Sequence, residues 1–290
     1  MARVSWAVAV WKRRLGQGLI LGAMLAGCRP SADAPTDAPP IPDNNPPAET
    51  IVPSVRCATE LGRFSGLQWQ ARSQGLSGPG PNVWNACNAW LASDGLHLRV
   101  DRIGGVWTSA EVFTTSVVGY GRIEMELASP VHALDPNVVL GFFTYPSGGL
   151  DGLHEIDIEI ARFGVTAANA TNLNYIVYPG SAPKGTLSKC ALRWDLPVTA
   201  SVHRFLWSAS AVSFQSFDVT TIASNTIPYR AWTFVPSGAF TISSGRWPLH
   251  LNLWLYEGKA PANGQPVEIV IRRVTYSTTT ATTIPSTTCR

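Results

Sequence analysis

Apolar and polar residues alternate over short runs along most of the chain after residue 53. The runs are rich in β-branched and aromatic residues, and turn-forming pairs such as Asn263-Gly264 separate them. A period of 2 is typical of strands with one buried face, and no long stretch keeps the helical period of 3.6. The pattern predicts strands at Leu96–Val100, Ala110–Thr114, Gly121–Leu127, Val138–Tyr145, Glu155–Ile160, Leu173–Tyr178, His203–Trp207, Val212–Phe217, His250–Leu255 and Val267–Tyr276. Many short strands with regular turns indicate an all-β sandwich or barrel.

One predicted strand carries three acids in alternation with isoleucine. In His154–Ile160, which reads HEIDIEI, the period of 2 places Glu155, Asp157 and Glu159 on one face and the isoleucines in the core. Neighbouring carboxylates raise one another's pKa, so such a row is costly unless it has a task. Only 14% of the chain is charged, which makes this density of acids unusual. The alternative is a solvated outer face on which the acids pair with Lys or Arg of neighbouring strands.

Paired carboxyl groups are the machinery of glycoside hydrolysis. With retention of configuration, one acts as nucleophile and one as acid/base, about 5 to 5.5 Å apart. Glu155 and Glu159 would lie ~13 Å apart along a strand that rises ~3.3 Å per residue, and flexible side chains over a concave sheet can close much of that gap. Crowding also raises the pKa, as the acid requires. We therefore expect Glu155 and Glu159 in the two main roles and Asp157 in support.

The run Glu155–Glu159 (EIDIE) resembles the active-site signature of glycoside hydrolase family 16, the family of lichenases, laminarinases, agarases, carrageenases and xyloglucan-modifying enzymes. The resemblance implies a β-jelly roll, a sandwich of two curved antiparallel sheets of the concanavalin type with a concave substrate cleft. It implies Glu155 as nucleophile, Asp157 as its assistant and Glu159 as acid/base. The implied activity is that of a retaining endo-glycosidase, of glucanase or galactanase type, on a β-linked polysaccharide.

The surroundings of the signature supply candidates for substrate binding, because further short runs fall in the family's order between about residue 80 and residue 276. The resemblance implies glycan contacts for Asn85, Glu111, Asn174, Asn252 and Trp254. Among other aromatic residues, Trp107 and Trp84 are further candidates for stacking on sugar. The alternative to sugar binding is packing in the core for each tryptophan. For each asparagine it is hydrogen bonding to buried backbone groups.

The chain also departs from the family pattern. Lichenase-like members carry a tryptophan two residues before the nucleophile, where Leu153 stands here, and a tryptophan of the preceding strand is replaced by Phe142-Phe143. The substrate therefore does not follow from any one subfamily. The unbroken spacing of the acids predicts a regular strand, as in lichenases and xyloglucan enzymes, without the one-residue bulge more frequent in laminarinases and agarases.

The first 53 residues have a different character. Basic residues at 3 and 12–14 precede the apolar run Leu15–Leu25, and Leu25–Cys28 (LAGC) resembles the lipobox of bacterial lipoproteins. We expect a signal peptide over 1–27 and a lipid on Cys28; an ordinary signal peptide with a chance cysteine is the alternative. Residues 28–53 hold eight prolines, which predicts a disordered tether. The folded domain would then span 54–290, in a protein exported and lipid-anchored to the bacterial cell envelope, at the outer membrane or cell surface.

The charge balance excludes one class of function. The formal net charge is +3, but residues 1–27 hold four of the basic residues, and the rest of the chain has 18 basic and 19 acidic residues. A nucleic-acid binder needs a basic face, which this balance does not favour. No apolar run reaches the ~18 to 20 residues of a membrane span.

Four cysteines remain once Cys28 is assigned to lipid: Cys57, Cys87, Cys190 and Cys289. An even number is typical of disulfides in an oxidising compartment. Sequence alone permits three pairings, and we favour Cys57 with Cys289 because that bond would join the two ends of the domain. No closely spaced Cys or His pair indicates zinc.

Other functions use the same residues. A transglycosylase would let a sugar resolve the covalent intermediate, a lectin-like protein would bind glycan without turnover, and a structural surface protein would leave the acids solvated. We expect a polysaccharide as partner, membrane contact through the lipid on Cys28, and a monomer. No cofactor is required, although the family often carries a structural calcium ion. Glu124 and Glu126 alternate in a second strand, and whether they face a cleft or solvent stays open.

Overall fold

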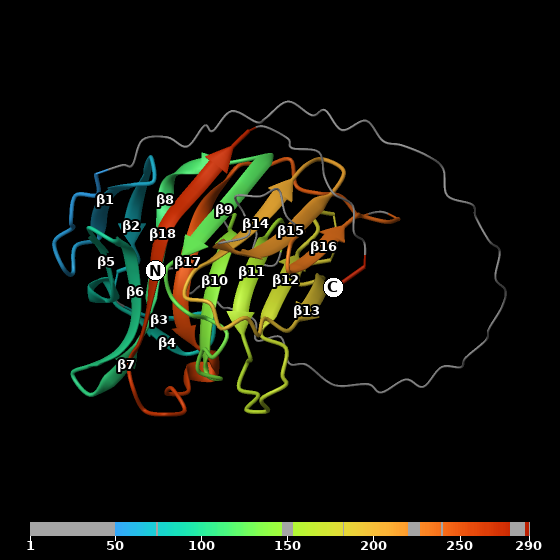
Figure 1. Ribbon diagram of the computed structural model, residues 1–290. Helices are drawn as coiled ribbons and strands as arrows, with labels where there is room; N and C mark the ends of the chain where they lie inside the picture. The colour runs from blue at the N-terminus through green and yellow to red at the C-terminus, as the bar shows by residue number, and fades with distance from the viewer. Residues whose placement is uncertain are drawn as a thin grey trace. The chain divides into compact units, whose positions relative to one another are not determined.

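Two antiparallel sheets lie face to face, as the overlapping layers of Figure 1 show. The computed structural model describes residues 50–73, 75–146, 153–181, 183–219, 227–238, 240–278 and 288–289. These residues belong to one unit of the chain. The all-β jelly-roll architecture expected from the sequence is confirmed.

The first sheet has eight strands, and the acid-bearing strand β11 lies well inside it. In spatial order the strands are β1 (Glu60–Phe64), β2 (Leu67–Ala71), β8 (Ala110–Val118), β17 (Trp247–Leu255), β10 (Val138–Thr144), β11 (Ile156–Ala161), β12 (Leu173–Val177) and β13 (Ser188–Leu192). β1 and β13 are therefore the two edges of this sheet.

The second sheet also has eight strands. Its order is β16 (Arg230–Phe234), β15 (Val212–Asp218), β14 (Ser201–Trp207), β9 (Gly121–Leu127), β18 (Val267–Ser277), β6 (Gly95–Ile103) and β5 (Ala89–Ala92), with β7 (Val106–Thr108) paired to β6. A separate hairpin joins β3 (Gly75–Ser77) to β4 (Asn82–Trp84), and the 3₁₀ turns η1 (Ala86–Asn88) and η2 (Tyr256–Gly258) connect strands.

The main core lies between the sheets, and alternation along each strand decides which residues enter it. From β11 the isoleucines 156, 158 and 160 are at most 2% exposed and belong to this core. Phe205 and Phe214 of the second sheet belong to the same cluster, and Phe142 packs on Phe205 with ring centroids 5.7 Å apart. Because each inward residue is flanked by outward ones, the three acids must project from the opposite face of the first sheet.

The ten strands predicted from alternation are all present, with small shifts at their ends. The short strands β1 to β5, β7, β13 and β16 were not predicted, because three to five residues give too few alternations for a pattern to emerge. No helix of the described residues is long and apolar enough to cross a membrane.

The favoured disulfide Cys57–Cys289 is wrong: the bonds are Cys57–Cys87 and Cys190–Cys289. Cys57 precedes the edge strand β1, whereas Cys190 lies on β13 at the opposite edge of the same sheet. Adjacent strands are about 4.8 Å apart, so the width of the sheet separates the two ends of the domain. Cys57 is joined instead to Cys87 of η1, and Cys289 is joined to Cys190 of the edge strand β13.

Candidate active site

The three acids lie on one face of the first sheet, which we call the acid face. β11 begins at Ile156, so Glu155 immediately precedes it, and its carbonyl accepts a hydrogen bond from the Tyr178 amide at 2.9 Å. The register of β11 with β10 and β12 is unbroken from Ile156 to its C-terminal part, which confirms the regular strand predicted from the spacing. The side chain of Glu155 interacts with that of Asp157 and contributes to the raised pKa of Asp157.

The residues directly opposite the acids carry no charge. Asp157 lies between Phe143 of β10 and Ile176 of β12. Glu159 lies between Gly141 and Asn174 in the same two strands. Asp157 and Glu159 therefore lack the directly opposed cations that a solvated charged face would provide.

Burial raises the pKa of two of the three acids, and for Asp157 the neighbouring carboxylates add to the rise. Burial, followed by the charges of Glu155 and Glu159, raises the pKa of Asp157 well above its usual value. Burial raises the pKa of Glu159 to about 7, and the positive charge of Lys189 opposes this rise. A carboxyl group with a raised pKa beside a further carboxyl group is the arrangement that an acid and a nucleophile need.

Two residues that sequence reasoning missed surround the trio. Lys189 of the edge strand β13 lies opposite Ile176, in the same transverse row as Asp157, and its ammonium is 4.6 Å from the centroid of the Phe163 ring. Burial lowers the pKa of Lys189 while Glu159 and Asp157 raise it. Burial, and then the charges of the three acids, raises the pKa of Tyr178. Lys189 is two strands away from Asp157. Its place beside the acids therefore becomes known only from the pairing of β12 with β13.

Gly141 makes room above the sheet between Glu159 and Asn252. A Cβ atom at this glycine would be 2.4 Å from Oδ1 of Asn252, so any larger residue would push the amide away. Asn252 is 4% exposed, and its Oδ1 is buried without a hydrogen-bond partner in the described part of the chain. A buried acceptor without a donor is costly, which makes this oxygen a point where a ligand hydroxyl or a protonated carboxyl would be stabilising.

Asn174 lies beside Glu159, and its side chain forms hydrogen bonds with backbone carbonyl groups. Its amide nitrogen donates to the carbonyl oxygens of Glu159 and Ala161, each at 3.1 Å, and the side chain is buried. These bonds fix the end of β11 from the acid face. The structure thus supports the backbone-bonding alternative for Asn174, although the residue stands next to the acid.

Glu111 is held on both of its oxygens. Oε2 accepts a hydrogen bond from Arg72 at 2.6 Å, and Oε1 lies 3.0 Å from Nδ1 of His250. Burial alone would raise the pKa of Glu111, but the hydrogen bonds and charges of His250 and Arg72 outweigh it and lower the pKa. Arg72 also bonds Ser77 and stacks on Trp84 at 4.5 Å. Glu111 lies on the acid face, opposite Asn252.

The other predicted binding residues are placed as follows. Trp254 lies on β17, two positions after Asn252, and is 8% exposed in a cluster with Trp84. Trp84 is fully buried, with its ring N–H bonded to the Ser77 carbonyl. Asn85 caps η1 by accepting from the Cys87 amide, and Trp107 lies on β7 of the second sheet, partly packed on the main core. The structure does not bring Asn85 and Trp107 onto the rows that carry the acids.

His154 does not follow the strand pattern. Its φ of 62° is left-handed, so the chain turns just before Glu155 rather than continuing as a strand. Its ring lies 5.9 Å from that of Trp247 and rests against Gly180, where a Cβ would be 2.4 Å away. Burial lowers the pKa of His154. These contacts fix the turn that presents Glu155.

Open pockets lie elsewhere on the molecule. Two of about 340 and 290 Å³ share Arg162 and Ala133 in their lining, and none of the three acids lines either. Among the described residues no group of three or more His, Cys, Asp or Glu side chains is arranged to hold a metal ion. The structural calcium ion that the family often carries is not tested by this structure.

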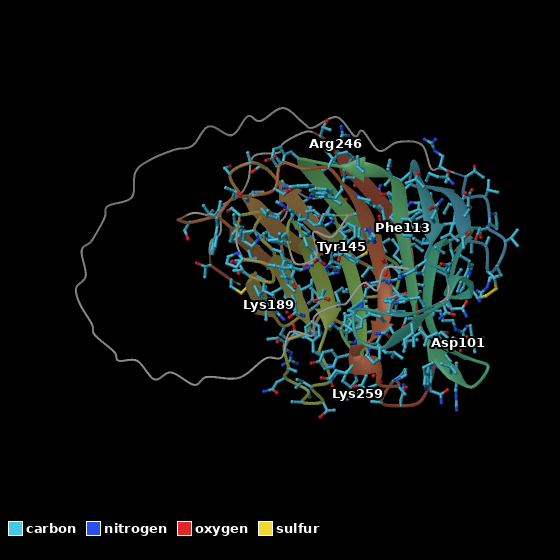
Figure 2. The ribbon with its side chains drawn as sticks, turned by 180° about the vertical axis from the view of Figure 1, so that it is seen from behind. Asp101, Phe113, Tyr145, Lys189, Arg246 and Lys259 are labelled. Atoms are coloured by element: carbon cyan, nitrogen blue, oxygen red, sulfur yellow. A yellow bond between two sulfur atoms is a disulfide. The ribbon has the colours of Figure 1, made fainter. Side chains whose placement is uncertain are left out.

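Figure 2, viewed from the side of the first sheet, shows Phe113, Tyr145 and Lys189 on the same side of the molecule. These residues belong to β8, to the residue that follows β10, and to β13. The acid face thus carries aromatic and charged side chains from several strands, as expected of a surface that binds an extended polar chain.

The chain matches no model of a protein family and no curated protein. Solved structures do resemble it. A lichenase from a mouse hindgut metagenome is 20% identical over 80% of this chain and 100% of its own, with a TM-score of 0.54. A glycoside hydrolase family 16 enzyme of Bacteroides ovatus, solved with a mixed-linkage glucan product, is 14% identical over 72% and 94%, with a TM-score of 0.56. A pseudo β-1,3-glucanase of Mycobacterium tuberculosis is 19% identical over 79% and 100%, with a TM-score of 0.54. This chain therefore resembles the structures of glycoside hydrolase family 16 in fold.

Proposed function

We propose that the protein is a retaining endo-glycosidase that hydrolyses a β-linked polysaccharide. The observation that carries this proposal is the trio of Glu155, Asp157 and Glu159 at the regular strand β11, where no cation lies directly opposite Asp157 or Glu159. The shared fold supports it, since the similar structures include a lichenase and a complex with a glucan product.

The reaction follows from the protonation of the trio. Glu155, ionised, attacks the anomeric carbon, while Glu159 gives its proton to the leaving glycosidic oxygen. Asp157, kept neutral by its raised pKa, donates a hydrogen bond to the Glu155 carboxylate and fixes its orientation. Glu159, now ionised, takes a proton from water, and the resulting hydroxide attacks the same carbon and releases Glu155.

Replacing the nucleophile tests the proposal. Purified full-length protein is incubated with β-glucans, agar, carrageenan and xyloglucan, and new reducing ends are measured. We expect release from at least one polysaccharide, and its loss in Glu155→Gln. The matched control is Glu124→Gln, which removes a carboxylate of the second sheet that pairs with Arg204. Glycan binding without new reducing ends in the wild type would instead indicate a lectin-like protein, and transfer to added acceptor sugars would indicate a transglycosylase.

We further propose that the protein is exported and anchored through a lipid on Cys28. Cys28 and the expected tether up to residue 49 lie outside the described residues, whereas Ile51 packs against the main core. Two disulfides in the described domain support an oxidising compartment, where such bonds persist. Labelling cells with an alkyne-bearing fatty acid should modify the wild type and not Cys28→Ser, and equal labelling of both would contradict the anchor.

A further inference from the structure

His250 occupies the centre of an aromatic row on the acid face. It lies opposite Phe143 of β10 on one side and Phe113 of β8 on the other, and Phe143 lies opposite Asp157. Two strand spacings, roughly 10 Å, therefore separate the backbone of His250 from that of Asp157. His250 is therefore too far from Asp157 to touch the reacting bond. It would contact a sugar unit about two units along the polysaccharide.

The imidazole is stacked on both sides. Its ring centroid lies 5.6 Å from that of Phe113 and 5.1 Å from that of Phe143, at interplanar angles of 27° and 28°. Tyr145 meets it edge-on at 5.8 Å. The three aromatic side chains are half-buried, so each keeps an exposed part. Because the ring faces of Phe113 and Phe143 are turned toward the imidazole, the row offers a ligand its exposed ring edges, with a polar ring atom in the middle.

Glu111 is poorly placed to bind glycan itself. Its side chain is 10% exposed, and its two oxygens are already bonded to Arg72 and His250. A sugar hydroxyl would have to compete with a charge-assisted hydrogen bond of 2.6 Å. The contact with His250, in contrast, engages only Nδ1 of the imidazole. For its Nε2 the structure records no partner in the described part of the chain, so that nitrogen is the group left for a ligand.

We infer that His250 supplies the hydrogen bond to a sugar hydroxyl that the family resemblance assigns to Glu111, and that Glu111 and Arg72 are positioning residues that orient its ring. The inference rests on the proposed function, because it names how the same site holds its polysaccharide. The ligand chemistry is that of a hydroxyl-bearing pyranose whose ring hydrogens lie on the ring edges of Phe113, Phe143 and Tyr145. With Nδ1 engaged by Glu111, Nε2 is left to exchange a hydrogen bond with the sugar hydroxyl, as acceptor in the imidazole and as donor in the imidazolium.

Steady-state kinetics on the polysaccharide that the wild type hydrolyses test the inference. In His250→Phe, which keeps the stacking and removes the nitrogens, KM should rise about 3- to 10-fold, the effect of one hydrogen bond, with kcat nearly unchanged. His250→Gln should recover part of this loss. His97→Gln is the control, since His97, like His250, contacts carboxylate and stacks on an aromatic ring, here Trp90, but lies on β6 of the second sheet. An unchanged KM in His250→Phe would overturn the inference.

A double-mutant cycle separates positioning from direct contact. Glu111→Gln should raise KM in the wild-type background and have little further effect in His250→Phe, because its action passes through the imidazole. The same increase in both backgrounds would mean that Glu111 contacts glycan independently, and would overturn the assignment.

Binding measurements distinguish a failure of this inference from a failure of the proposed function. Calorimetry with Glu155→Gln protein uses hexasaccharides of β-1,3-, β-1,4- and mixed-linked glucose and of agarose as probes. Binding that weakens in the Glu155→Gln/His250→Phe protein supports the inference even if the wild type hydrolyses nothing. Hydrolysis by the wild type with equal binding by both proteins overturns the inference alone. Binding of no probe, together with no hydrolysis, overturns both.

Discussion

Two strands of the molecule carry alternating carboxylates, and their surroundings differ. On β9 of the second sheet, Glu124 lies opposite Arg204 and Glu126 opposite Arg273, and both pairs form salt bridges, at 3.4 and 3.0 Å. On β11 the directly opposed residues are apolar or neutral. Both rows place an acid at every second position, so the neighbours across the sheet decide whether such a row is paired with arginine or forms a candidate active site.

The difference shows how the surroundings of a carboxylate row set its effect on stability and its ability to give a proton. A carboxylate opposite arginine is stabilised as the anion, which suits a structural role. A buried carboxylate without an opposed cation retains its proton, and the pKa of Glu159 rises to about 7. Such a group costs stability once it is ionised, and in return it can give a proton near neutral pH.

The largest expected effect comes from removing the acid of β11. In Glu159→Gln the leaving oxygen must depart without a proton, so kcat should fall by about 10²- to 10⁴-fold. The measurement is release of reducing ends from the polysaccharide that the wild type hydrolyses. Substrates with a good leaving group need less protonation and should lose less. A decrease under twofold on the native polysaccharide would contradict the role given to Glu159.

The pH profile should follow the protonation of the same residue. Since activity needs protonated Glu159, kcat should fall as pH rises through about 7, by about tenfold per pH unit above it. Lys189→Met removes the cation that lowers this pKa, so the descending limb should move to higher pH. Lys259→Met, at an exposed lysine paired with Glu257, is the control and should leave the limb in place.

Replacing Glu159 of β11 should lower activity but raise stability at high pH. The pKa of Glu159 is raised in the folded state from 4.5 to about 7, so its favourable contribution is complete below pH 4.5 and is lost as pH rises through 7. The change in the free energy of unfolding caused by Glu159→Gln should therefore be more favourable at pH 8 than at pH 4, by roughly 1–3 kcal/mol. Denaturant unfolding at the two pH values measures this, and an equal change at both would contradict it.

The smallest effect is expected on β9. Glu126→Gln weakens contacts with Arg272 and Arg273, which are partly exposed, so the free energy of unfolding at pH 7 should fall by about 1 kcal/mol. Activity should be unchanged. A loss of activity comparable to that of Glu159→Gln would mean that the two carboxylate rows do not differ as their neighbours suggest.

Much of this architecture was predictable from the chain alone. Alternation located the ten longer strands and placed the isoleucines of β11 in the core, because side chains of a strand must point to opposite faces. The same rule put Glu155, Asp157 and Glu159 together. It also contained a signal that was not used: His250, Asn252 and Trp254 alternate along β17, so a face that includes Asn252 must include His250.

Long-range pairing could not be predicted in this way. The disulfides depend on which strands form the edges of the first sheet, and the role of Glu111 depends on Arg72 and His250, which are distant in sequence. Asn85 and Trp107 were chosen for their residue type and their place in sequence, and neither property reports which sheet or turn will hold them.

By itself, the sequence determined the all-β class, the strand with three acids and the side of that strand on which they lie, because these follow from local periodicity. Only the tertiary structure decided that β11 lies inside its sheet, that neutral residues oppose its acids, and that Lys189 and His250 share their face. The physical reason is that pKa and hydrogen bonding depend on burial and on charges across neighbouring strands, which strand order sets and local pattern does not.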